Sequence, residues 1–307
     1  GTGEVAMTPE QRAVWLTKRL KNIGSSESAA LLGISPWKTR FELWMEKAGE
    51  IDPPELDNAY VHWGTLLEPA VALGVAAEKG WKIQKVHRYI ESAAVMGMAA
   101  SLDYEIISHP KGPGCLEIKT MDRWEWKQIG EELPLHYEVQ LQHQLAVTQR
   151  SWGAVGLLVG GNDLRVFERE THEGVSQRIQ TEIREFWLSV REKRRPPIDW
   201  DADADTVIAL HQQVEPKKVV KLEADGALQD MLVGYLGAGA AIRDHEGFRK
   251  RARAMLLEAM DDAEVAFVET PDHGTFRIKS WVVDEAEIKT VRRGYRQVRV
   301  TPPKEQE

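Results

Sequence analysis

The stretch MAASLDYEIISHPKGPGCLEIKT, residues Met98–Thr120, decides the fold that the sequence predicts. Residues Met98–Ile107 are mostly small and apolar, and residues Cys115–Thr120 alternate apolar with polar side chains, so both segments are expected to be strands. The segment between them, His109–Gly114, has the proline and glycine content of a turn. The stretch therefore predicts a β-hairpin.

This hairpin would bring Asp103 level with Glu117 and Lys119. Because side chains in a strand repeat every second residue, Glu117 and Lys119 are expected to point to one face. Two carboxylates and an ammonium group in one place are costly to bury unless a divalent cation joins them. The pattern indicates a metal-dependent phosphodiesterase site. The alternative is a surface hairpin whose charges merely alternate, since Glu-x-Lys occurs often by chance.

The composition is that of an ordinary globular protein. The chain has 307 residues, of which 42% are hydrophobic and 29% charged, so one large or two small domains are possible. Its single cysteine, Cys115, excludes a disulfide framework, a cysteine zinc site and an iron–sulfur cluster. No apolar run approaches the roughly 20 residues of a membrane span, and no signal peptide opens the chain, so we expect a cytoplasmic protein without a membrane partner. The net charge of −8 argues against general coating of nucleic acid but is compatible with a local basic channel.

The segments before the hairpin are mainly helical. Expected helices run from the capping box Thr8–Gln11 to about Lys21, from Ala29 to Leu32, from Arg40 to Ala48 and from Val61 to Ala77, and a strand is expected over Trp81–Glu91. The serine-rich segment Ile23–Ser28 is either a plain helix cap or an anion site. Trp63, Leu66, Ala70 and Leu73 form an apolar row in the fourth helix. Glu68 lies within that helix, where a carboxylate is costly unless it is paired or bound to a metal.

The segments after the hairpin alternate between helix and strand. Residues Leu135–Thr148 are expected to form a helix with Tyr137, Gln140 and Gln144 on one side, either as the wall of a site or as structural hydrogen-bonding groups. Expected strands over Trp152–Val159 and Leu164–Glu168 form a second hairpin, and a helix is expected over Gly174–Arg195.

The C-terminal third has a simpler pattern. It predicts a helix within Lys221–Asp262 and a hairpin within Ala263–Val283. Residues Lys289–Lys304 contain six Lys or Arg and no Asp or Glu, which favours either a nucleic-acid contact or a solvated tail. We expect residues 8–198 to form the core domain and residues 199–307 a helical and hairpin extension that contacts DNA or another subunit.

Five short motifs, taken in order, resemble the phage-type alkaline exonucleases of the YqaJ and lambda-exonuclease group, within the PD-(D/E)xK nuclease superfamily. The motifs are Ile23–Trp37, Trp63–Pro69, Ser101–Asp103, Leu116–Thr120 and Tyr137–Gln142. One departure is Leu102, where the superfamily pattern has proline; the metal chemistry belongs to Asp103. The resemblance covers residues 19 to 160 and thins from about residue 200.

The resemblance implies an α/β (α+β) fold with a restriction-endonuclease-like core, in which helices flank a central mixed sheet, followed by a C-terminal helix and β-hairpin. It implies that Asp103, Glu117 and the backbone carbonyl of Ile118 bind Mg²⁺, with Mn²⁺ as a substitute, and that Glu68 completes or supports the site. Lys119 would orient or deprotonate the attacking water. Whether one or two ions bind stays open.

The same resemblance implies a 5′-to-3′ exonuclease of phage-type recombination that acts on double-stranded DNA ends and leaves 3′ single strands. Arg19, Ser26 and Gln140 are expected to bind the 5′-phosphate. Further implied properties are a homo-oligomer, commonly a trimeric ring, a single-strand annealing protein as partner, and the cytoplasm of a bacterial host, with a phage or prophage as the source. The alternatives are a restriction-like or repair endonuclease with the same core and a catalytically inactive DNA-end-binding protein.

Overall fold

The computed structural model describes residues 17–53, 59–211, 213, 216–217, 219–220, 226–270 and 274–279. The chain divides into two compact units, Gly1–Leu210 and His211–Glu307, and each is described by itself. The expected helix start Thr8–Gln11 and the basic segment Lys289–Lys304 lie outside the described residues. The proposed division after residue 198 stays a prediction.

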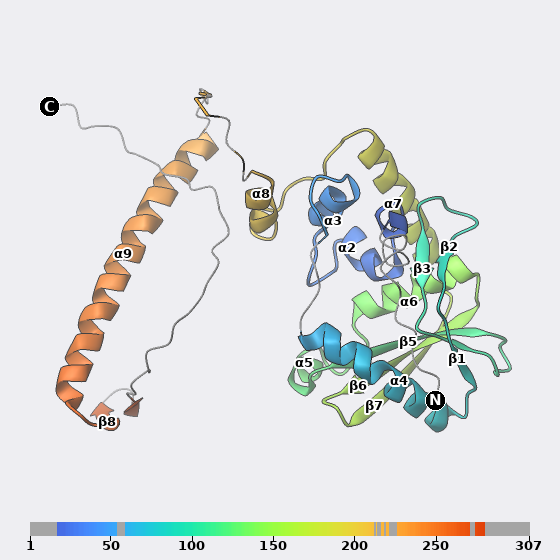
Figure 1. Ribbon diagram of the computed structural model, residues 1–307, viewed down its shortest axis with the longest axis horizontal. Helices are drawn as coiled ribbons and strands as arrows, with labels where there is room; N and C mark the ends of the chain where they lie inside the picture. Colours follow the sequence, from blue (N-terminus) through green and yellow to red (C-terminus); the bar gives the residue numbers. More distant parts are fainter. Residues whose placement is uncertain are drawn as a thin grey trace. The chain divides into compact units, whose positions relative to one another are not determined.

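The centre of the first unit is a five-stranded mixed sheet in the order β1-β4-β5-β6-β7 (Figure 1). The strands are β1 (Ile83–Lys85), β4 (Tyr104–Ile106), β5 (Gly114–Met121), β6 (Trp152–Val159) and β7 (Asp163–Glu170). Strands β5 and β6 are parallel and the other pairs are antiparallel. The parallel pair is joined through α5 (Arg123–Gln128) and α6 (Leu135–Thr148), as a parallel connection requires. The expected mixed sheet is confirmed.

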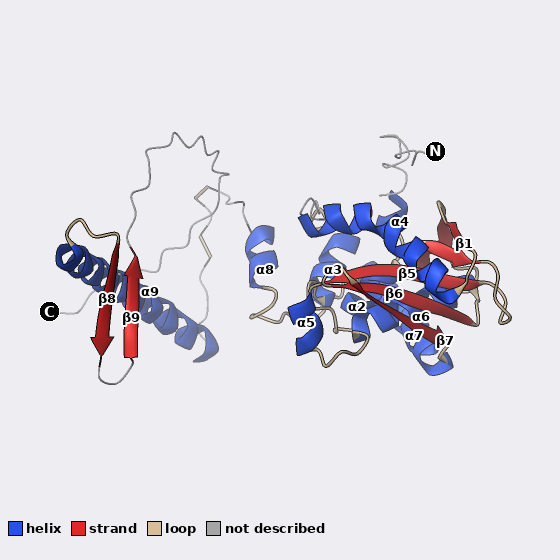
Figure 2. Ribbon diagram, turned by 90° about the horizontal axis from the view of Figure 1, so that it is seen from below, coloured by secondary structure: helices blue, strands red, loops and turns tan. Residues whose placement is uncertain are grey.

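Helices cover both faces of this sheet (Figure 2). The helix α4 (Ala59–Lys79) packs on one face and α6 on the other. Beyond α6 lie α2 (Ser28–Leu31), α3 (Arg40–Lys47) and α7 (Glu173–Arg191), and α8 (Ala204–Leu210) contributes to the same apolar cluster. Leu43, Trp44, Met45, Ile179 and Phe186 are at most 2% exposed in that cluster. No described helix is both long enough and apolar enough to span a bilayer.

The strand expected over Met98–Ile107 is broken in two, which corrects the simple hairpin. Residues Ala99–Ser101 form β3, which pairs with β2 (Tyr89–Glu91) in a separate two-stranded sheet, whereas β4 pairs with β5. The strand expected over Trp81–Glu91 is broken in the same way into β1 and β2. The chain therefore changes sheets at Leu102 and Asp103.

The apolar row expected on α4 faces away from the sheet, which corrects a second expectation. Trp63, Leu66 and Leu73 are 59%, 56% and 67% exposed. The buried side of α4 is made instead by Val71, Ala72 and Val75. A helix with apolar residues on several sides has more than one periodic row, so the period alone does not select the face that packs.

The second unit contains a long helix and a hairpin, as expected. The helix α9 spans Gly226–Met260, and β8 (Val265–Thr270) pairs antiparallel with β9 (Gly274–Lys279). The ladder ends at the pair Thr270–Gly274, within the segment Ala263–Val283 that was expected to form a hairpin. The expected fold class, including its C-terminal helix and β-hairpin, is thus confirmed.

Candidate active site

The break between β3 and β4 places Asp103 beside β5. Tyr104 pairs with Leu116, so Asp103 comes level with Glu117, as the sequence predicted. The Asp103 Oδ2 atom accepts a hydrogen bond of 2.8 Å from the backbone N–H of Ile118. The Asp103 carboxylate therefore accepts a hydrogen bond from a backbone N–H of β5 at the point where the chain changes sheets.

Glu117 is held by three side chains. Its Oε1 accepts from Gln140 Nε2 at 2.5 Å and pairs with Lys119 Nζ at 2.6 Å, and its Oε2 accepts from Gln144 Nε2 at 2.5 Å. Gln140 and Gln144 lie one turn apart on α6, so their amides meet the same carboxylate. Glu117 itself is 3% exposed. The polar row of α6 therefore lies against Glu117, and Gln144 joins the predicted Gln140 there.

The ammonium group of Lys119 is partly buried and lies 5.4 Å from the ring centroid of Tyr137. Burial would lower the pKa of Lys119, but the neighbouring carboxylates of Glu117 and Asp103 outweigh it and raise the pKa above its usual value. In this state Lys119 is a proton donor. Its candidate role as a base requires that the charge of Glu117 be taken up by another cation.

The carboxyl group of Asp103 lies in a buried and negatively charged environment. Burial, the charge of Glu117 and then that of Glu68 raise the pKa of Asp103 to about 8, although Lys119 and the N–H of Ile118 act in the opposite direction. Two carboxyl groups this close in a buried place do not both ionise readily on their own. The arrangement is therefore short of positive charge.

Glu68 lies at the edge of this group rather than in it. It is an α4 residue, and its Oε1 forms an ion pair with Lys85 Nζ on β1. Its side chain is 19% exposed and that of Lys85 28%. Lys85 was not singled out from the sequence, because one lysine in an alternating strand carries no distinguishing signal.

The oxygen atoms available at this site suit Mg²⁺ better than an ion whose ligands all come from the protein. Among the described residues, no three His, Cys, Asp or Glu side chains converge on one point. Asp103, Glu117 and the carbonyl of Ile118 are the available donors, and Mg²⁺ commonly takes one or two carboxylates together with waters and substrate phosphates. The raised pKa of Asp103 agrees with a site that needs a cation to hold both carboxylates ionised. The residues present therefore fit the ion.

The three predicted 5′-phosphate residues fall into two groups. Gln140 belongs to the Glu117 cluster, whereas Arg19 Nη2 lies 3.6 Å from Glu27 Oε1, and Ser26 is exposed in the short 3-10 helix η1 (Ser25–Glu27). Both η1 and α2 pack on α6. The two groups therefore lie on elements that are in contact, and their joint role stays a proposal.

The buried contact between α2 and α6 fixes one histidine tautomer. His143 Nε2 lies 2.9 Å from the carbonyl oxygen of Ala99, so Nε2 carries the proton. Nδ1 then accepts from the Ser28 hydroxyl at 2.5 Å. Burial lowers the pKa of His143 to about 4, which keeps the imidazole neutral. This contact lies next to Gln144 in the chain and ties the serine-rich segment to the helix that holds Glu117.

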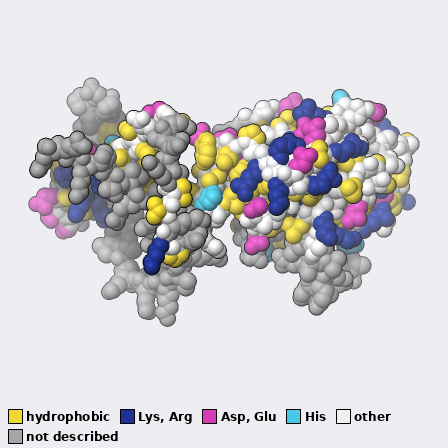
Figure 3. Space-filling view, turned by 90° about the horizontal axis from the view of Figure 1, so that it is seen from above, with side chains coloured by type: hydrophobic (Ala, Val, Ile, Leu, Met, Phe, Trp, Pro, Cys, Tyr) yellow, Lys and Arg dark blue, Asp and Glu magenta, His cyan; other side chains and the backbone are white. Residues whose placement is uncertain are grey.

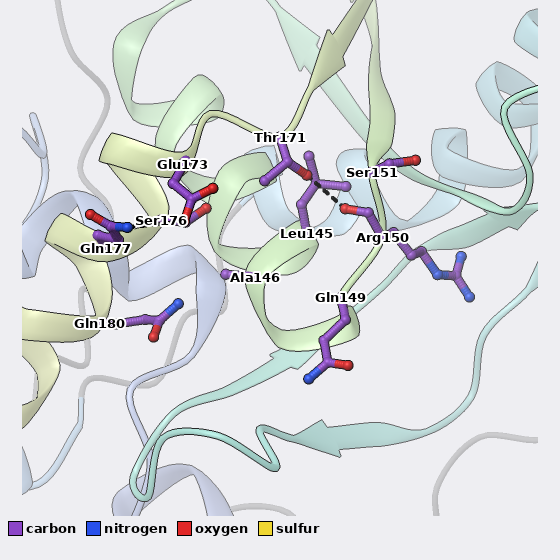
Figure 4. Close-up of a pocket in the computed structure, with 10 residues that line it drawn as sticks. All are labelled: Leu145, Ala146, Gln149, Arg150, Ser151, Thr171, Glu173, Ser176, Gln177 and Gln180. Carbon is purple, nitrogen blue, oxygen red and sulfur yellow. Dashed lines mark hydrogen bonds between the residues drawn. The ribbon is translucent and has the colours of Figure 1, made fainter.

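A separate cavity of about 340 Å³ lies between the end of α6 and the start of α7 (Figure 4). Leu145, Gln149, Thr171, Ser176 and Gln180 are among its lining residues. The guanidinium of Arg150 points away from it (Figure 4) and binds the carbonyl of Gly114 and the carboxylate of Glu105. None of the site residues lines this cavity.

The surface charge of the first unit is mixed on the face seen in Figure 3. Lys and Arg side chains are interspersed there with Asp and Glu, and they form no continuous basic strip on that face of the described residues. On this face the positive charge is therefore local rather than continuous, which agrees with the net charge of −8.

Replacing both Gln140 and Gln144 by Leu should weaken Mg²⁺ or Mn²⁺ binding by about 10- to 100-fold, because groups that orient a ligating carboxylate contribute at this level. Isothermal titration of the metal-free protein measures the effect. The matched control is Gln142→Leu, on the same helix, whose amide binds the carbonyl of Glu170 and the N–H of His172 instead. An affinity that falls as far in the control would refute a specific role for the two glutamines.

The sequence and the fold are similar to those of known proteins. Residues 14–151 match the family of YqaJ-like viral recombinase domains. The uncharacterized protein YqaJ of Bacillus subtilis (strain 168) is 28% identical over 263 residues, which cover 84% of this chain and 81% of that protein. The alkaline exonuclease LHK-Exo from Laribacter hongkongensis has a similar structure, with a TM-score of 0.50 and 22% identity over 59% of this chain and 93% of that chain. LHK-Exo in complex with dAMP gives a TM-score of 0.50 at 23% identity over the same shares. Residues 14–151 are therefore similar to YqaJ-like viral recombinase domains, and the fold is similar to that of an alkaline exonuclease, so the resemblance found in the sequence is confirmed.

Proposed function

We propose that this chain is a Mg²⁺-dependent 5′-to-3′ exonuclease that degrades one strand from the ends of double-stranded DNA and leaves 3′ single strands. The observation that carries the proposal is Glu117, which faces Asp103 and is fixed by Gln140, Gln144 and Lys119. The similar proteins, a viral recombinase domain and an alkaline exonuclease, support the same class of reaction.

In this proposal each residue of the site has a distinct task. Asp103, Glu117 and the carbonyl of Ile118 hold the ion, which when bound lowers the pKa of water and offsets negative charge on the phosphate. Gln140 and Gln144 keep the Glu117 carboxylate in one orientation. Lys119 orients the attacking water from the same strand face. Mn²⁺ is expected to replace Mg²⁺.

The proposed partners follow from the same reaction. The substrate is the end of a DNA duplex, and the single strand that remains is the substrate class of an annealing protein. We also propose a homo-oligomer, of which a trimeric ring around DNA is one form, and a bacterial cytoplasm as the place of action, with a phage or prophage as the source.

The decisive experiment compares a linear duplex with the same DNA as a relaxed closed circle, with Mg²⁺ or with EDTA. An exonuclease degrades the linear form and leaves the circle intact, and EDTA stops it. Cutting of the circle would instead identify a restriction-like or repair endonuclease. Binding without hydrolysis would identify an inactive end-binding protein. Labels at the 5′ and 3′ ends determine polarity.

Arg19→Ala should slow the digestion of 5′-phosphorylated ends about tenfold more than that of 5′-hydroxyl ends. A charge-assisted contact to a phosphate contributes on the order of 1.5–3 kcal/mol, and only the phosphorylated end can lose it. The measurement is the initial rate on both substrates. Lys18→Ala, one residue earlier on the exposed side of the same helical turn, is the control. Equal slowing on both ends would rule out the pocket.

A further inference from the structure

Strand β1 places a second lysine next to the carboxylate site. Lys85 pairs with Tyr104 across β1 and β4, and the N–H of Val86 donates to the carbonyl of Asp103 at 3.2 Å. The ammonium group of Lys85 lies 5.0 Å from the ring centroid of Tyr104. Lys85 therefore has a defined position beside Asp103.

The carboxylate of Glu68 points to this lysine. Lys85 Nζ donates to Glu68 Oε1, and both side chains are largely buried, with 28% and 19% of their surfaces exposed. Burial would lower the pKa of Lys85, but its contact with Glu68, and more weakly Asp103, raises it. Glu68 is in turn close enough to contribute to the raised pKa of Asp103. The three groups thus share one electrostatic environment.

The charged groups around Asp103 form two ion pairs, neither of which includes Asp103 itself. Glu117 is paired with Lys119 and Glu68 with Lys85, and Asp103 is left with the N–H of Ile118. Among the described residues, no group of three His, Cys, Asp or Glu side chains could hold a metal ion, so Glu68 does not join Asp103 and Glu117 as a third ligand.

We propose that Lys85 is a positioning residue that occupies Glu68 and so restricts divalent cation binding to the Asp103–Glu117 pair. The inference rests on the proposed function only in taking a divalent cation as the ligand. A carboxylate bound by an ammonium group has less negative charge and fewer free lone pairs to offer a metal. Removing Lys85 frees Glu68 and leaves its charge uncompensated beside Asp103.

The test is a titration of the metal-free full-length protein with Mn²⁺ and with Ca²⁺, without DNA. Lys85→Met should bind Mn²⁺ about tenfold more tightly than the wild type, or take up an additional ion, since one uncompensated charge at this distance is worth about that much. The gain should disappear in Lys85→Met combined with Glu68→Gln, which should match Glu68→Gln alone. Lys79→Met, which removes a lysine of α4 that pairs with Glu168 at 3.0 Å, should change nothing.

Two results would overturn the inference. One is Mn²⁺ binding that is no tighter in Lys85→Met; the other is an equal gain in the Glu68→Gln background, which would mean that Lys85 acts through its general field. If Lys85→Met does not fold, Lys85→Arg replaces it: the retained pairing should leave the affinity unchanged or weaker, and a gain would refute the idea. DNA hydrolysis by the wild type is recorded separately. If the wild type does not hydrolyse DNA but the gain in Lys85→Met depends on Glu68, the exonuclease proposal is refuted and this inference stands. If the wild type hydrolyses DNA but the gain is absent, this inference is refuted and the exonuclease proposal stands.

Discussion

Asp103→Asn and Glu117→Gln should each lower Mg²⁺-dependent hydrolysis of linear duplex DNA by at least about 1000-fold. Each change removes one of the two carboxylates that hold the ion in the proposed site, and the ion supplies several kcal/mol of charge stabilisation in the transition state. The measurement is the rate of nucleotide release at saturating Mg²⁺. Near-normal turnover in either variant would remove the site assignment.

The fold should survive both changes, because the carboxylates serve the ion rather than the core. In Asp103→Asn a carbonyl oxygen can still accept from the N–H of Ile118. In Glu117→Gln the new NH₂ group meets amide donors, but the Oε1 atom of Gln144 has no partner in the described structure and can accept from it after a rotation of that amide. Thermal unfolding checks this.

The neighbouring carboxylate of Glu105 provides the matched control for these two variants. Glu105 belongs to β4 and is bound by Arg150 rather than by the site. Glu105→Gln removes the same unit of charge two residues from Asp103, so it should retain most of the activity. A loss as large as in Asp103→Asn would show that net charge, rather than ligation, governs the rate.

The sequence predicted best those features that depend on residues close together in the chain. The register of Asp103 against Glu117 follows from a strand, a turn and a second strand that are consecutive in the chain. The helix Leu135–Thr148 has the predicted bounds, and its polar row already contained Gln140 and Gln144. The pattern left open the partner of that row, because the contacts of Gln140 and Gln144 with Glu117 join residues that are 23 and 27 positions apart in the chain.

The pattern failed where the outcome depends on long-range packing. The break at Asp103 arises because β3 pairs with β2 and not with β5. The packed face of α4 was misassigned because both of its apolar rows have helical spacing, and only the sheet selects Val71, Ala72 and Val75. Lys85 could not be recognised at all, since its pairing with Glu68 joins two elements that are separate in sequence.

Lys119→Ala should lose hydrolysis by about 100- to 1000-fold and still bind both metal and DNA, which distinguishes Lys119 from the two carboxylates. Lys119 is bound to Glu117, and the carboxylates of Glu117 and Asp103 raise its pKa. Removing the ammonium group leaves Glu117 with its two amide donors and one fewer competing cation, so Mn²⁺ affinity should stay the same or rise. The lost group is the one that can orient the water.

The measurements for Lys119→Ala are the turnover rate in Mg²⁺, Mn²⁺ binding by titration, and duplex binding in Ca²⁺. Lys119→Arg is the companion variant, because it keeps the charge but changes the position and acidity of the donor. If Lys119 acts only by neutralising Glu117, Lys119→Arg should be nearly as active as the wild type. If it orients or deprotonates the water, both variants should be slow while their metal affinities are retained. Metal binding that fails together with turnover would place Lys119 among the groups that assemble the ion site.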